Sequence, residues 1–235
     1  MKTIGLLGGM SWESTAFYYR KINELVKQKL GGLHSARIAM VSVDFREIGN
    51  LQRENKWDEA GELLSKAALQ VEAAGADFLL ICTNTMHKVA PTIEKAISIP
   101  LLHIADATAD EIKKHGITRV GLLGTNFTME QGFYRDRLKG NHGLEVLVPE
   151  EKDRALIHRI IFDELVLGIV NEQSRAEYLR IMNDLKNMGA EGIIEGCTEI
   201  GMLVQQEHTI IPLFDTAAIH SERAVEVALL QSRAA

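Results

Sequence analysis

The chain has 235 residues, of which 46% are hydrophobic and 25% charged, a composition typical of a globular protein with one large domain or two small ones. A net charge of -6, with no lysine or arginine cluster, excludes the basic surface that nucleic-acid binding requires. The N-terminus turns polar too soon for a signal peptide, and no apolar run reaches membrane-spanning length, so we expect a cytoplasmic protein that binds no membrane. Its two cysteines lie outside any CxxC or Cys/His spacing, so the sequence predicts neither a disulfide framework nor a metal site.

Short aliphatic and β-branched runs alternate with amphipathic patterns along the chain. The predicted strands are residues 3–8, 37–44, 77–83, 100–104, 119–125, 144–149, 191–198 and 209–215. The predicted helices are residues 12–30, 57–74, 107–115, 129–140, 153–167 and 174–188. Because strands that alternate with helices are typical of a parallel sheet, the sequence predicts an α/β fold.

Three segments of the first half recur in the second half in the same order. The matched pairs are 3–22 with 119–138 (Gly-Leu-Leu-Gly), 73–86 with 187–200 (Gly-Ala-acidic), and 97–103 with 209–215 (Ile-Pro-Leu). An ordered triple match at a nearly constant offset predicts two duplicated, pseudosymmetric α/β lobes with mainly parallel sheets. We place lobe 1 at residues 1–98 plus 210–235 and lobe 2 at residues 99–209.

The repeat also decides which residue of lobe 1 corresponds to Cys197. Aligning Gly75 with Gly189 sets Thr83, and not Cys82, opposite Cys197. Neighbouring side chains on a strand point to opposite faces, so a shift of one residue decides which of them reaches a site. We expect Cys82 to pack as a small buried apolar residue, and we expect Thr83 and Cys197 to meet at an interlobe cleft beyond the carboxyl ends of the strands.

Turns that follow the strands supply candidate anion-binding groups. Backbone N–H groups after the first Gly-Gly turn could bind an anion, but GLLGGM is not the GxGxxG pattern of nucleotide sites. Together with Ser11 and Thr125, they could hold a carboxylate or simply form helix caps. Asn84 and Thr85 could likewise cap the next helix or donate to a substrate anion.

Several other polar residues have weaker signals. Four are surface residues by default, although one of them would suit a second carboxylate: Arg46, Gln52, Arg53 and Lys88. Three histidines fit no metal spacing, and we expect them at the surface or in supporting positions: His34, His87 and His103.

The segments GGMSWEST (8–15), TNTMHK (83–88) and GCTEIG (196–201) together resemble the aspartate/glutamate racemase family over essentially the whole chain. The resemblance implies two α/β lobes with the active site between them, an amino-acid substrate, no pyridoxal phosphate or other cofactor, no metal, and a homodimer. The family usually has Cys-Asn-Thr in the first lobe. Thr83 stands here in place of that cysteine, a substitution similar to the one that marks enzymes specific for L enantiomers.

By the same resemblance, Thr83 and Cys197 are implied as the catalytic residues. Eight residues are implied to line the substrate site: Met10, Ser11, Gln52, Asn84, Thr85, Thr125, Thr198 and Glu199. Similar archaeal aspartate racemases use an arginine and a lysine for the side-chain carboxylate. Arg46 matches the arginine, but Val166 stands at the position of the lysine, so the choice between aspartate and glutamate stays open.

Racemisation needs two acid/base groups on opposite faces of a planar carbanionic intermediate. A cysteine thiolate is a reasonable base, because nearby donors and helix N-termini can lower its pKa below about 8.5. A threonine hydroxyl can only donate a proton near neutrality. We therefore predict that Cys197 removes the proton from the L enantiomer and that Thr83 returns one on the other side.

Two alternatives stay open on the sequence alone. One keeps the fold and changes the reaction to that of a hydantoin racemase, an arylmalonate decarboxylase or a maleate isomerase. The other is a two-lobed amino-acid-binding protein without catalysis.

Overall fold

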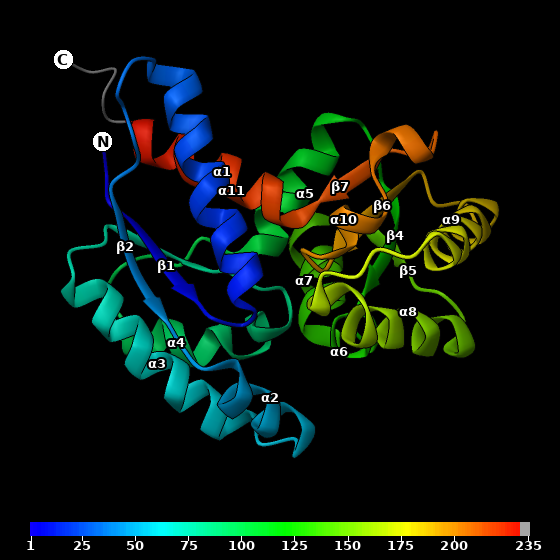
Figure 1. Cartoon of the computed structure of the whole chain (residues 1–235), viewed down its shortest axis with the longest axis horizontal. Coiled ribbons are helices and arrows are strands. Elements are labelled where there is room, and N and C mark those ends of the chain that lie inside the picture. Colours follow the sequence, from blue (N-terminus) through cyan, green and yellow to red (C-terminus); the bar gives the residue numbers. More distant parts are fainter. Residues whose placement is uncertain (231–235) are drawn as a thin grey trace. The chain divides into compact units, whose positions relative to one another are not determined.

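The computed structural model describes residues 1–230 and separates into two compact units. Unit 1 consists of Met1–Ile104 and His220–Ala235, of which the last five residues lie outside the described part, and unit 2 consists of Ala105–Ile219. Each unit contains one parallel sheet with helices packed against it, so the predicted α/β class with two lobes is confirmed (Figure 1). The lobe limits predicted from the sequence, 98/99 and 209/210, stay a prediction.

Unit 1 is built on a three-stranded sheet in the order β2-β1-β3. Its strands are β1 (Ile4–Gly8), β2 (Ile38–Ser42) and β3 (Phe78–Ile81). Its helices are α1 (Trp12–Leu30), α2 (Phe45–Arg53), α3 (Trp57–Ala73), the 3-10 helix η1 (Thr85–Val89), α4 (Ala90–Ala96) and the larger part of α11 (Thr216–Leu229). Strands β1 and β3 are buried at every position, as expected for parallel strands with helices on both faces.

The two faces of this sheet carry different partners. Leu7 of β1 and Ile81 of β3 pack with Leu64 of α3 and Ile48 of α2 in one apolar cluster. Helix α1 covers the other face (Figure 1), where the Tyr18 hydroxyl contacts Nδ1 of His220 on α11 at 2.9 Å. Helices therefore cover both faces of the sheet. The carboxyl ends of β1 and β3 lead into the turns before α1 and η1.

Unit 2 is built on a four-stranded sheet in the order β5-β4-β6-β7. Its strands are β4 (Arg119–Gly124), β5 (Glu145–Leu147), β6 (Gly192–Gly196) and β7 (Leu213–Asp215). Its helices are α5 (Ile104–Lys114), α6 (Asn126–Glu130), α7 (Gly132–His142), α8 (Glu151–Asp163), η2 (Leu165–Leu167), α9 (Glu172–Asn187), α10 (Ile200–Leu203) and η3 (Gln206–His208). Within residues 1–230, no helix is both long and apolar enough to cross a membrane, and no group of three or more His, Cys, Asp or Glu residues could hold a metal ion.

The duplication is visible in the hydrogen bonds of the two sheets. In unit 1, Gly5 pairs with Leu79, and the Leu79 N–H donates to the Pro100 carbonyl at 2.9 Å. In unit 2, Gly121 pairs with Ile193, and the Ile193 N–H donates to the carbonyl of Pro212 at 2.8 Å. The two sheets therefore share one register, which is the register that the sequence repeat predicts.

That register fixes the equivalence of the strand ends. Leu7 pairs with Ile81 in unit 1, and Leu123 pairs with Glu195 in unit 2. The residues two positions further along are Thr83 and Cys197. The correspondence of Thr83 with Cys197, deduced from the sequence, is therefore matched by strand pairing within each unit.

Some elements differ from the sequence prediction. Residues 100–104 form no strand, because only Leu101 bridges Leu79 before the chain enters α5 at Ile104. In unit 2 the matching segment pairs with β6 over three residues as β7. Helices α2, α4, α10 and α11 were not predicted, α6 was not separated from α7, and α5 starts three residues earlier than predicted.

We expect Gly5→Ala to lower the free energy of unfolding by roughly 1–3 kcal/mol, because overpacking shifts backbone as well as side chains. A Cβ atom at Gly5 would lie 2.7 Å from the Phe78 carbonyl oxygen and 2.7 Å from Cγ1 of Val71. The control is Gly49→Ala in α2, where an added Cβ has no neighbour within 4 Å and the helix gains propensity. Urea unfolding followed by circular dichroism measures both; equal midpoints for the wild type and Gly5→Ala would contradict this prediction.

Candidate active-site residues

Cys82 is a buried residue of unit 1 and not an exposed thiol. It is 0% exposed, its N–H donates to the Leu7 carbonyl at 2.9 Å, and its own carbonyl accepts the Ser14 hydroxyl at 2.9 Å. Burial raises the pKa of the thiol far above its ordinary value, so the group stays protonated. The expectation that Cys82 packs as a small apolar side chain is confirmed.

Thr83, the next residue, is half-buried and lies in the turn between β3 and η1. Its carbonyl oxygen is 2.8 Å from Nδ1 of His87, while Nε2 of the same ring accepts the Ile104 N–H at 3.3 Å. Since a backbone N–H can only donate, Nε2 is the acceptor and the neutral ring donates from Nδ1 to Thr83. This hydrogen bond from His87 therefore holds the backbone of Thr83 in place.

Three histidines of unit 1, His87, His103 and His220, are buried, whereas His34 is exposed at the surface. The rings of His87 and His103 lie 4.5 Å apart, and His87 and His220 lie 6.0 Å apart. Nε2 of His220 donates to the Leu102 carbonyl at 2.8 Å, and burial, then the neighbouring His87, lowers the pKa of His220 to about 3. Of the two roles expected for His87 and His103, the surface one is therefore wrong, and His87 has a supporting one.

Ser11 and Thr125 have the same local role in the two units. Ser11 Oγ accepts the Ser14 N–H at 3.2 Å at the start of α1, and Thr125 Oγ1 accepts the Thr128 N–H at 3.3 Å at the start of α6. Of the two roles that the sequence left open for them, the helix cap is realised. The N–H of Gly9 donates to Thr15 Oγ1 at 2.8 Å, so it is already used within unit 1.

Asn84 and Thr85 lie buried at the start of η1. Although Asn84 is the N-cap residue of η1, its side chain makes no capping hydrogen bond there. The capping role that the sequence allowed for Asn84 is therefore absent from η1. Thr198 is half-buried in the turn after β6.

Gln52 and Met10 are both buried in unit 1, so the surface position expected for Gln52 by default is wrong. Gln52 is buried on α2, and its Nε2 is 2.9 Å from Sδ of Met86. Met10 and Met86 both belong to the apolar cluster between the sheet and α3. The contact with Met86 therefore places the Gln52 amide against that apolar cluster.

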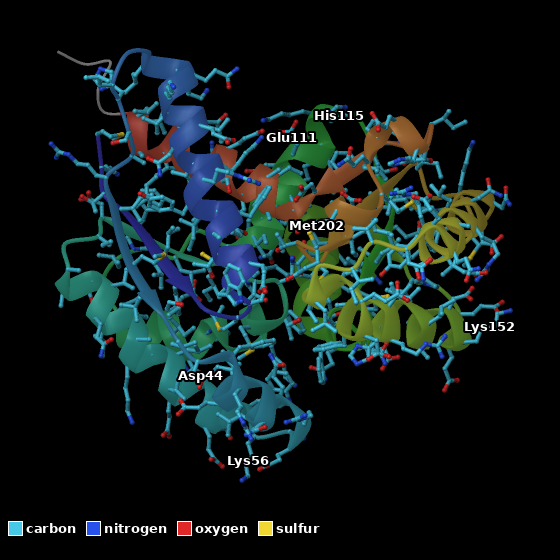
Figure 2. The ribbon with its side chains drawn as sticks, viewed as in Figure 1. Asp44, Lys56, Glu111, His115, Lys152 and Met202 are labelled. Carbon is cyan, nitrogen blue, oxygen red and sulfur yellow. The ribbon has the colours of Figure 1, made fainter. Side chains whose placement is uncertain are left out.

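Of the basic residues near α2, Arg46 and Arg53 are exposed as expected by default, whereas Lys88 is half-buried. Arg46 is exposed, and Arg53 donates to the side chain of Asn50. Lys88 lies over the Trp57 ring, 3.8 Å from its centroid, and partial burial lowers its pKa. Figure 2 labels Asp44, the N-cap residue of α2, and Lys56, the N-cap residue of α3.

Cys197 differs from Cys82 in exposure and in its partner. It is half-buried, and its Sγ–H donates to Oε2 of Glu199 at 3.0 Å. Burial of the thiol, and next the charge of Glu199, raise the pKa of Cys197 well above its ordinary value. Met202, labelled in Figure 2, lies on α10, the four-residue helix that follows Glu199.

The sequence left the protonation state of Cys197 open, since nearby donors and helix N-termini can lower the pKa of a thiol. Here Glu199, the N-cap residue of the short α10, accepts the hydrogen bond of the thiol instead. The negative charge of Glu199 opposes thiolate formation. The thiol is therefore protonated and donates its hydrogen bond to Glu199.

Comparison with known proteins bears on the chemistry of these residues. The family described as Asp/Glu/hydantoin racemase matches residues 7–224. The chain belongs to this racemase family.

Relatives of this racemase-family chain span nearly its full length. It is 26% identical to the broad specificity amino-acid racemase RacX of Bacillus subtilis over 231 residues, which cover 96% of this chain and 98% of RacX. A crystal structure of a candidate Asp/Glu racemase from Yersinia pestis is 56% identical with a TM-score of 0.92, covering 97% of this chain and 100% of that one. An aspartate racemase homologue from Pyrococcus horikoshii is 34% identical with a TM-score of 0.85, covering 97% and 99%.

The sequence analysis of this racemase-family chain missed Glu195. This residue of β6 is 3% exposed, and its Oε1 has no hydrogen-bond partner within residues 1–230. Burial, and then the charge of Asp215 on β7, raise the pKa of Glu195 to about 8. The repeat contained the signal, because Glu195 aligns with an isoleucine, Ile81.

Glu195 makes stability depend on pH. Its folded pKa of about 8 exceeds its ordinary value of 4.5, so its contribution is fully present below pH 4.5 and is lost as the pH rises through 8. We expect Glu195→Gln to match the wild type near pH 4.5 and to become progressively more stable than it up to pH 8, by at most about 4–5 kcal/mol. Urea unfolding at several pH values measures this difference. A difference that does not vary with pH would contradict the assignment.

Proposed function

We propose that this racemase-family chain is a cofactor-independent racemase of aspartate, glutamate or both, with a preference for the L enantiomer. The observation that carries the proposal is the shared register of the two sheets, which makes Thr83 the counterpart of Cys197. Both residues are half-buried, whereas Cys82 is enclosed. The family and the names of the relatives support an amino-acid substrate.

In the proposed mechanism, Cys197 acts on the L face of the α-carbon. Its thiol first passes its proton to Glu199, the partner 3.0 Å away. The ammonium group of an amino-acid substrate favours this transfer, because a nearby positive charge stabilises a thiolate. The thiolate then takes the α-proton and leaves a carbanion whose charge spreads onto the α-carboxylate.

Thr83 acts on the opposite face in this proposal. Its hydroxyl donates a proton to the strongly basic carbanion and regains one from water, since an alkoxide does not persist near neutrality. The bond from His87 to the Thr83 carbonyl holds the backbone that carries this hydroxyl. We assign Asn84, Thr85, Thr125 and Thr198 as donors near the α-carboxylate, where preorganised donors stabilise developing charge.

The preference for L has a thermodynamic limit. Enantiomers have equal free energy, so the two values of kcat/KM must be equal in solution, whatever residues line the site. Proton exchange with solvent has no such limit, because Cys197 can remove a proton from the L enantiomer and return another to the same face. The preference should therefore be clearest in α-proton exchange.

The decisive experiment follows the α-proton of L- and D-aspartate and L- and D-glutamate by NMR in heavy water, without added cofactor. We expect Cys197→Ser to slow exchange from the L enantiomers by roughly 10²- to 10⁴-fold, because it removes the base. Thr83→Ala should retain exchange from L and lose conversion to D. Cys82→Ala is the matched thiol control and should retain both. Unchanged exchange in Cys197→Ser, or no exchange of any of the four substrates by the wild type, would refute the proposal.

A gain of function tests Thr83 separately. Thr83→Cys should speed α-proton exchange from the D enantiomers, because a thiol with an ordinary pKa of about 8.5 supplies a base that a hydroxyl cannot. The same NMR assay measures it, with circular dichroism as the check on folding. Unchanged D exchange in a folded Thr83→Cys variant would contradict the role given to Thr83.

A further inference from the structure

Glu195 is an acid at a position that does not need one for folding. Its counterpart in unit 1 is Ile81, which pairs with Leu7 as Glu195 pairs with Leu123 and is completely buried. Burying a carboxyl group with an unpaired oxygen costs free energy that an isoleucine would not. A costly buried acid in place of an apolar residue is typical of a functional position.

Glu195 lies on the α9 side of the sheet of unit 2, two residues before Cys197. A Cβ atom at Gly121, which pairs with Ile193, would meet Leu185 of α9, so this face is covered by α9. Strand residues two apart share a face, which places Glu195 on the α9 side too. Cys197 follows two residues later, in the turn at the end of β6.

Tyr178 of α9 connects the two groups. Its side chain is completely buried, and its hydroxyl donates to the Ile157 carbonyl at 3.4 Å. Burial raises the pKa of Tyr178 first, and the charges of Cys197, Glu164 and Glu195 raise it further. The pKa of Tyr178 therefore responds to the charges of both Glu195 and Cys197.

We propose that Glu195 is a positioning residue for Cys197, which by binding or releasing one proton sets the pH range in which the Cys197 thiolate can form. While Glu195 is protonated, the thiol has one acidic neighbour, Glu199. When Glu195 loses its proton to solvent, a second negative charge opposes the thiolate. Its effect on catalysis rests on the proposed function, whereas its effect on the thiol does not.

Other titratable groups face this region from each neighbouring element. Tyr178 and Glu164 approach from the α9 and η2 side, and the Glu164 carboxylate accepts the Ser174 hydroxyl at 2.7 Å. Asp215 approaches from β7, where its Oδ1 accepts the N–H groups at the start of α11. The charges of these groups also act in this region, so a pH profile measured for Cys197 includes their titration.

The test measures alkylation of Cys197 by iodoacetamide between pH 6 and 10, with the Cys197 peptide quantified by mass spectrometry. Glu195→Gln should lower the apparent pKa of the thiol and speed labelling at pH 9 roughly three- to tenfold, since one nearby negative charge is removed. At pH 6.5, where Glu195 is neutral in the wild type, the two rates should agree within about twofold. Glu151→Gln, which removes an exposed carboxylate of α8, is the control and should leave the profile unchanged.

Several results would overturn the inference. One is a Glu195→Gln profile that coincides with that of the wild type. Glu195→Ile installs the residue of the other unit, and it should reproduce the shift if Gln perturbs folding. If neither variant folds, the acid is structural and the inference is wrong.

The same variants in the heavy-water assay separate this inference from the proposed function. Exchange that needs Cys197 but has the same pH profile in Glu195→Gln would overturn the inference alone. A shifted alkylation profile in a protein that exchanges no α-proton would support the coupling and refute the function.

Discussion

The two-residue alternation of a β-strand is the constraint on which the rest of the structure depends. Directly after β3, Cys82 is enclosed and Thr83 is half-buried, and directly after β6 the equivalent of Thr83 is the half-buried Cys197. Pairing with β1 and β4 fixes that phase, because a slip of one residue would move every side chain of the strand to the opposite face of the sheet. Strand packing alone therefore places the Thr83 hydroxyl and the Cys197 thiol at equivalent strand ends.

The electrostatics of unit 2 favour a protonated thiol in the absence of substrate. Cys197 donates to Glu199, Glu195 lies on the preceding strand β6, and Asp215 lies on the neighbouring strand β7. Burial and the charge of Glu199 disfavour the thiolate, and a nearby positive charge would favour it. In the proposed function the substrate's own ammonium group supplies that charge, so the arrangement couples substrate binding to activation of the base.

Much of the fold could be predicted from the sequence, because its strands are continuous aliphatic runs and its long helices are amphipathic. Helix α1 was predicted to the residue, and the repeat gave the register of both sheets. Residues 100–104 were harder, since an aliphatic run shows the tendency to form a strand but not whether the chain turns into a helix after one bridge. Short helices such as α4 carry too few turns to show a period.

The candidate site was predictable only in part, for a different reason. Residue types and spacing singled out Thr83 and Cys197, but the pKa of a thiol depends on burial and on how Glu199 is turned toward it. The sequence could not show that His87 supports Thr83. The role depends on His87 contacting both Thr83 and Ile104, and Ile104 comes next to His87 only in the folded chain. The repeat shows Glu195 as an acid where unit 1 has Ile81. Only the structure shows that this acid is buried, which is what makes the difference informative.

The path of the chain between the units has a consequence for dissecting this protein. Helix α11 begins in unit 2 and ends in unit 1, where His220 binds both Tyr18 and the Leu102 carbonyl. A gene fragment encoding residues 1–104 alone would therefore lack the histidine that joins α1 to the segment before α5. Reconstituting unit 1 by itself requires the C-terminal helix grafted onto that fragment, or a circularly permuted gene in which α11 precedes β1.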